Sequence, residues 1–195
     1  MNGESLPNGD PVLQTHPLPA GTPPPFRVLA AKTMIAHTLT YVVMGVLASR
    51  FLNYAALFGR PCSGMRPMNS IWVMIGPLLQ PIRGLLFASV FYPLRSRLFG
   101  VKDGWLMMSW ILVAIGILST FSPATGSFEG LVYSTVPASI QLRGWLEIMP
   151  QAVLLSALLC YWINHPGKRW LTWVLSILFA LTTGIISLGL FARNK

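Results

Sequence analysis

The sequence predicts an all-α protein: a polytopic bundle of transmembrane helices with five spans and a disordered, proline-rich N-terminal tail. The 195 residues are 53% hydrophobic and only 10% charged, whereas soluble domains carry about 25% charged residues. Long apolar runs recur along the chain, and tryptophan and tyrosine residues stand near their ends, as in the aromatic belts of membrane proteins. Too little polar sequence remains to cover these runs in water, so we expect a lipid bilayer around them.

Residues 1–27 are expected to form the tail. They are rich in proline and glycine and lack the apolar core of a signal peptide. Such a composition favours a disordered or polyproline-like chain. The tail is either a solvated extension or a docking peptide, and no tight motif favours the second. Residues 28–195 then form the membrane domain.

Five segments of the membrane domain approach the length of about 20 residues that a helix needs to cross a bilayer. The expected spans are 28–51, 71–94, 105–121, 144–164 and 170–192, of which the third is short. The loop at 122–143 is long for a compact bundle. It is either a lid over the outer mouth of the bundle or an exposed connector.

The distribution of basic residues gives the expected orientation. The long loop contains no lysine or arginine up to residue 142, whereas the short loop at 95–102 contains Arg95, Arg97 and Lys102. Cytoplasmic loops carry an excess of such residues, although the totals for the two sides are nearly balanced here. We therefore expect a multi-pass protein of the cell membrane with its N-terminus in the cytoplasm.

The stretch GPLLQPIRG, residues 76–84, places Arg83 inside the second span. The rest of that span, 84–94, covers about 16 Å as a helix, roughly half of a bilayer core. Arg83 is therefore expected near the midplane, facing inward, because a guanidinium cannot lose its charge there. Pro77 and Pro81 free backbone carbonyls that also need partners.

Glu147 is the one acidic residue within an expected span. It can pair with Arg143, one helical turn away, as an interfacial ion pair. It can instead reach Arg83 if the second helix is tilted or broken. The sequence favours the local pair slightly and leaves both open.

Further polar residues fall near the level of Arg83. They lie in the first, second and fourth spans, so they can converge at mid-membrane. With Arg83 and Glu147 they form the candidate ligand-binding set: Arg83, Gln80, His37, Tyr41, Gln151 and Glu147. The alternative is a set of separate interhelical hydrogen bonds, each contributing about 1 kcal/mol to stability.

Small residues recur at four-residue spacing in the last two spans. The fourth span has Ala152, Ser156 and Cys160, and the fifth has Ser176, Ala180 and Gly184. This spacing lets helix backbones approach closely. Because the connection between these spans is short, we expect an antiparallel hairpin packed along both small-residue faces.

Motifs for metal or cofactor chemistry are weak. Cys62, Met65 and Met68 form a C-x-x-M-x-x-M pattern, and thiolate and thioether ligands suit Cu(I). Structural contacts explain it more simply, since methionine is an ordinary interface residue. No P-loop or signature of a zinc protease or serine hydrolase occurs, and no second embedded histidine supports haem. We expect no cofactor.

Two functional classes remain. The first is a small binding or transport protein with an intramembrane site around Arg83 for an anionic or lipid-like ligand. The second is a non-catalytic accessory subunit of a larger membrane complex, and an enzyme is less favoured than either. Nucleic-acid binding is excluded because no basic face or known module appears. The expected partners are the bilayer, an anionic or lipid-like small molecule, and another membrane protein or a second copy of the chain.

Overall fold

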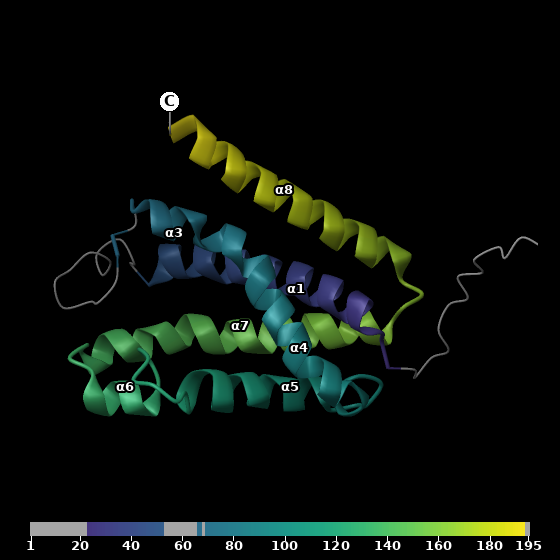
Figure 1. The fold of residues 1–195 in the computed structure, drawn as a ribbon, viewed down its shortest axis with the longest axis horizontal. Coiled ribbons are helices and arrows are strands. Elements are labelled where there is room, and N and C mark those ends of the chain that lie inside the picture. Colours follow the sequence, from purple (N-terminus) through teal and green to yellow (C-terminus); the bar gives the residue numbers. More distant parts are fainter. Residues whose placement is uncertain (1–22, 53–65, 68, 194–195) are drawn as a thin grey trace, which may run out of the picture.

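A computed structural model of the protein describes residues 23–52, 66–67 and 69–193. Every regular element within these ranges is helical, so the predicted all-α class is confirmed. Figure 1 shows several of the helices running nearly parallel along one axis. The expected tail lies outside the described residues except for its last few positions.

The first half of the described chain contains one long helix and one interrupted helix. They are α1 (Phe26–Phe51), α3 (Ile71–Ile75), the 3-10 turn η1 (Gly76–Leu79) and α4 (Gln80–Leu98). The second half contains a short apolar helix, a small surface helix and two long helices. They are α5 (Gly104–Val113) with its π-helical turn η2 (Ala114–Leu118), α6 (Phe128–Tyr133), α7 (Ala138–Asn164) and α8 (Arg169–Arg193).

Four helices in the described ranges are long and apolar enough to cross a membrane. They are Phe26–Phe51, Ile71–Leu98, Ala138–Asn164 and Arg169–Ala192. The expected third span is represented by a shorter apolar helix, Gly104–Leu118. At 1.5 Å per residue it covers about 22 Å, less than the roughly 30 Å of a bilayer core. The five-span prediction is therefore confirmed in outline, with one short member.

The second span is broken in its first third. Gly76 and Pro77 open the 3-10 turn, and Pro81 lies in the first turn of α4. Proline is tolerated at such helix starts because the first amide groups of a helix have no intrahelical acceptor. After the break α4 lies obliquely across α1 (Figure 1), and these two helices make the most extensive contact in the bundle.

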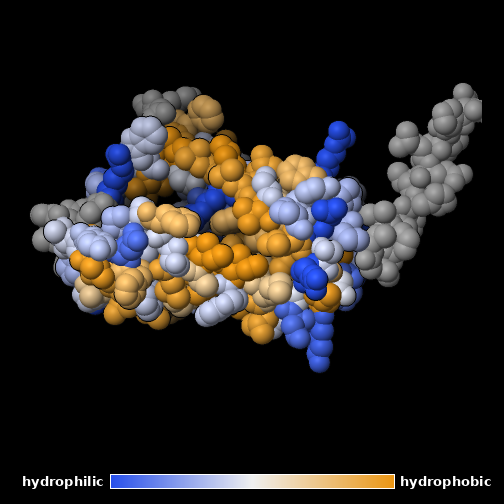
Figure 2. Space-filling model, turned by 60° about the horizontal axis from the view of Figure 1, so that its bottom comes forward, coloured by the Kyte–Doolittle hydropathy of each residue, from blue (hydrophilic) through white to orange (hydrophobic). Residues whose placement is uncertain are grey.

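The core lies among α1, α4, α5 and α7. Its largest fully buried apolar side chains come from all four helices: Leu29, Phe91, Leu98, Met108, Leu155 and Leu159. Figure 2 shows apolar surface over the middle of the molecule and hydrophilic groups gathered toward its two ends. That distribution is expected of helices that cross a bilayer.

Helix α8 contacts the bundle mainly through α1, η1 and α3. Leu171 and Leu175 pack with Leu39 and Trp162, and the Trp162 indole N–H donates to Thr172 Oγ1 at 2.9 Å. Beyond this point α8 diverges from α7 (Figure 1).

The predicted packing of the two small-residue faces is wrong. Ala180 and Gly184 are exposed, and a β-carbon on Gly184 would meet nothing within 4 Å. On α7, Ala152, Ser156 and Cys160 are buried in the main core instead. Lipid chains solvate an apolar helix as well as a neighbouring helix does, so spacing alone does not select a partner.

The long loop folds back onto the start of α7. The Gln141 side chain accepts from the Gly126 N–H at 3.0 Å and donates to the carbonyls of Gly130 and Val136 at 3.1 and 2.8 Å. The Trp145 indole N–H donates to the Gly126 carbonyl at 2.7 Å. The loop is thus a structured cap on one helix end, and α7 begins six residues before the expected span.

Candidate functional site

The candidate site begins where α1 and α4 approach most closely. A β-carbon on Gly84 would lie 2.6 Å from the Met34 Cα, so only glycine permits this separation of the backbones. Near this crossing His37, 2% exposed, projects from the middle of α1 toward Gln80 of α4. The two side chains form a buried hydrogen bond between His37 Nε2 and Gln80 Oε1 at 3.0 Å.

The hydrogen bonds of Gln80 determine the state of His37. The Gln80 amide nitrogen donates to the Gly76 carbonyl at 3.0 Å, a group near the break in the helix. Its amide oxygen must therefore accept, and His37 Nε2 must carry a proton. In a neutral imidazole this leaves Nδ1 as an acceptor. His37 Nδ1 is buried and has no hydrogen-bond partner among the described residues.

Arg83 lies one residue before the Gly84 crossing, but it is exposed on the flank of the bundle. Its guanidinium lies over the Phe87 ring at 5.6 Å from the centroid. The same ring meets His37 edge to face at 4.9 Å. Sequence analysis expected Arg83 to face inward with Gln80. The structure buries Gln80 and leaves Arg83 exposed, because residues three apart on a helix differ by about 60° in direction.

Tyr41 and Glu147 lie at the edge of the same group. The Tyr41 hydroxyl would be 3.8 Å from a β-carbon on Gly76, and Glu147 Oε1 would be 4.0 Å from one on Gly45. Glu147 also has an interaction partner of its own.

The structure thus brings together most of the sequence-predicted set. His37 joins Gln80 by a hydrogen bond and Tyr41 by a ring contact, and it shares the Phe87 ring with Arg83. Gln151 is half-buried on α7 and stands outside these hydrogen bonds. Figure 2 shows hydrophilic surface in a hollow between apolar surfaces, partway along the molecule. The arrangement offers the Arg83 guanidinium and the Tyr41 hydroxyl as donors, which suit an anionic group, whereas the His37 acceptor suits a donor.

The candidate Cu(I) ligands of the C-x-x-M-x-x-M pattern have no described position. Cys62, Met65 and Met68 lie outside the described residues. Within the part of the chain that the structure describes, no group of three or more His, Cys, Asp or Glu residues could hold a metal ion.

Two polar residues of structural importance were missed by sequence reasoning. Gln141 organises the loop before α7, and the Lys32 amine donates to the Trp162 carbonyl near the end of α7 at 3.1 Å. A cation at that position complements the negative end of a helix dipole. The loop before Gln141 was a signal for the first, because its Ser, Thr, Gly and Pro residues favour turns whose backbone groups need hydrogen-bonding partners. The second had no signal, because it joins residues 130 positions apart.

Comparison of the chain with protein-family models, with curated proteins and with solved structures found no match.

Proposed function

We propose that this integral membrane protein binds an anionic, lipid-like ligand at a site centred on Arg83. The observation that carries the proposal is the position of the guanidinium halfway along an apolar helical segment. No hydrogen bond or ion pair joins it to a described residue, and its contact is the Phe87 ring. Arginine cannot be neutralised in proteins, and lipid chains offer no acceptor. An anion bound beside the guanidinium would lower the free energy of keeping this charge among lipid chains.

The surroundings of Arg83 support an amphiphile rather than a simple ion. Ile82 and Leu86 beside it are exposed and apolar, so a ligand that reaches the guanidinium from the side also meets hydrocarbon-like surface. The Tyr41 hydroxyl supplies a further donor. His37 and Gln80 are buried and hold the α1–α4 crossing beside the site, and Gln151 and Glu147 lie on α7 at its edge. Binding at this depth is compatible with lateral entry from the bilayer, as in transport of an amphiphile.

The proposal includes a location in the cell membrane with the N-terminus in the cytoplasm. The start of α1, the end of α4 and the α7–α8 connection carry Arg27, Arg95, Arg97, Lys168 and Arg169. Basic residues in short loops are typical of the cytoplasmic side, whereas the long loop before α7 carries none up to Leu142.

A second candidate function is that of an accessory subunit. The specific observation is the exposure of α8. Only 6% of its apolar 18-residue stretch is buried against the rest of the protein. A partner helix could cover that face, and a carboxylate of the partner could pair with Arg83. The two functions differ in what lies against the guanidinium: a small amphiphile or another protein.

The experiment uses a photoreactive oleate analogue and the matching photoreactive alcohol, which lacks the carboxylate. The protein is reconstituted in phosphatidylcholine nanodiscs, and crosslinks to residues 76–92 are quantified by mass spectrometry. We expect oleate to label this segment and the Arg83→Met variant to lose about tenfold of the labelling, the effect of about 1.4 kcal/mol in binding. Arg97→Met, which removes an exposed cation at the helix end, is the control and should label normally.

Equal labelling by the alcohol, or unchanged labelling in Arg83→Met, would overturn the ligand proposal. The subunit function predicts a different pattern. In that case Arg83→Met would leave oleate labelling unchanged and lower the apparent mass of the protein on native gels of solubilised membranes.

A further inference from the structure

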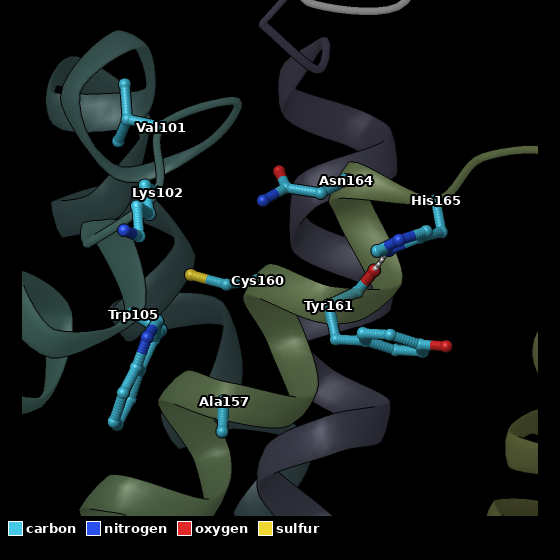
Figure 3. Close-up of a pocket in the computed structure, with 8 residues that line it drawn as sticks. All are labelled: Val101, Lys102, Trp105, Ala157, Cys160, Tyr161, Asn164 and His165. Atoms are coloured by element: carbon cyan, nitrogen blue, oxygen red, sulfur yellow. Dashed lines mark hydrogen bonds between the residues drawn. The ribbon is translucent and has the colours of Figure 1, made fainter.

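A second cavity lies at the basic end of the bundle, away from Arg83. Figure 3 shows it between the turn that carries Val101 and Lys102 and the last turns of α7, from Ala157 to His165. Its volume is about 270 Å³. Because α4 ends at Leu98 and α7 ends at Asn164, the cavity lies where two of the membrane-spanning helices end.

Asn164 contributes hydrogen-bond donors to this cavity. Its side-chain oxygen accepts from the Gly100 N–H at 2.9 Å, which fixes the orientation of the amide. The amide nitrogen therefore carries two N–H groups that are available to a ligand. Figure 3 shows this nitrogen directed toward the gap between α7 and the Lys102 turn.

The charge of the cavity is positive. Lys102 lines it. The Lys168 amine lies outside the lining and contacts the Tyr161 hydroxyl, which Figure 3 shows on the side of α7 away from Lys102. No acidic side chain is among the described residues that line it. His165 completes the rim, with its Nδ1–H donating to the Tyr161 carbonyl at 2.8 Å.

The remaining walls are apolar and aromatic. Trp105 and Tyr161 are partly exposed beside the cavity, and Ala157 and the buried Cys160 form its floor. Tryptophan and tyrosine at this level are typical of the zone between lipid headgroups and acyl chains. The cavity thus joins a cationic, donor-rich rim to an apolar wall that continues toward the membrane interior.

We propose that this cavity binds a phosphate group at the membrane surface, held by Lys102 and the Asn164 amide. The phosphate can belong to the headgroup of an anionic phospholipid, with its acyl chain along Ala157 and Trp105, or to a soluble phosphate ester. Phosphate oxygens accept hydrogen bonds from ammonium and amide donors, and the absence of a lining carboxylate suits an anion.

The test uses phosphatidic acid with a photoreactive group near its headgroup, in phosphatidylcholine nanodiscs. Crosslinks to residues 157–165 are quantified for the wild-type protein and for four variants. Asn164→Asp keeps the oxygen that accepts from Gly100 but replaces the donor with a carboxylate oxygen. Lys102→Gln removes the cation. We expect each to reduce labelling about tenfold, since each removes a charge-assisted hydrogen bond to the phosphate.

The other two variants are controls. Arg97→Gln removes an equal charge at the same end without touching the cavity, and Arg83→Met removes the mid-membrane cation. Both should label like the wild-type protein. The proposal for this cavity is thereby tested separately from the proposal for the Arg83 site. Equal loss in Arg97→Gln would mean a general attraction to the basic end and would overturn the proposal. Undiminished labelling in Asn164→Asp and Lys102→Gln would overturn it as well.

Two further arms identify the source of the phosphate. Photoreactive diacylglycerol, which lacks the phosphate, should label weakly, and equal labelling would show that the cavity recognises only acyl chains. Glycerol phosphate is then added as a soluble competitor. If it displaces the phosphatidic acid label, the cavity accepts soluble phosphate esters. If it does not, the phosphate is recognised as part of a lipid.

Discussion

Gly84 of α4 lies against the backbone of Met34 in α1, so that a β-carbon on Gly84 would approach the Met34 Cα to 2.6 Å. A contact of that length is with backbone and cannot be relieved by rotating a side chain. The crossing of α1 and α4 therefore depends on the absence of a side chain at position 84. The buried His37–Gln80 hydrogen bond bridges the same two helices.

Gly84→Ala is expected to destabilise the protein by about 1–3 kcal/mol, because the added methyl group forces two packed helices apart. The same displacement should weaken the His37–Gln80 bond. Thermal unfolding of the purified variant in detergent, followed by circular dichroism, measures the loss.

Two glycines of α8 serve as controls for the Gly84 experiment. A β-carbon on Gly189 or Gly184 would meet nothing within 4 Å, so Gly189→Ala should leave the unfolding temperature unchanged. Gly184→Leu should do the same, in contrast to the expectation from the small-residue spacing. A clear drop with Gly184→Leu would mean that α7 and α8 pack together after all. Equal effects of Gly84→Ala and Gly189→Ala would contradict the close crossing.

Gln141→Leu should unfold the cap before α7. The substitution leaves the Gly126 N–H and the carbonyls of Gly130 and Val136 without the partner that they have now. Buried groups that lose a partner cost about 1–3 kcal/mol each, and water can reach some of them, so we expect a total loss of about 2–4 kcal/mol.

Limited proteolysis within residues 122–137 reports the Gln141→Leu effect directly, as faster cleavage at unchanged protein concentration. Thr135→Ala, at an exposed position of the same loop, should cleave at the wild-type rate. An equally slow cleavage of Gln141→Leu would show that the loop is held by other contacts.

The topology predicts that the two ends of the bundle face opposite sides of the membrane. Ser96 lies near the end of α4 and Thr125 in the loop before α6, and both are exposed. With Cys62→Ser and Cys160→Ala as background, an impermeant maleimide should reach Thr125→Cys from outside the cell. Ser96→Cys should react only after the membrane is opened. Reaction of both from the same side would contradict the topology.

The candidate site was partly predictable from the sequence because depth in a membrane follows from position along a helix. Arg83, His37 and Gln80 each lie near the middle of an apolar segment, and helical rise alone puts them at similar levels. Direction around the helix axis could not be read in this way. Gln80 is buried against His37 while Arg83 is exposed, and that difference depends on how α4 crosses α1.

The sequence by itself determined the helical class, the approximate spans and the unusual depth of a permanent cation. These are properties of single segments, since hydropathy and helical rise add up along one stretch of chain. Only the tertiary structure decided which faces meet: Gly84 against Met34, Gln141 with its loop, and α8 largely apart from α7. Apolar helices are equally compatible with lipid and with each other, so their pairing depends on close packing and a few polar contacts between distant residues.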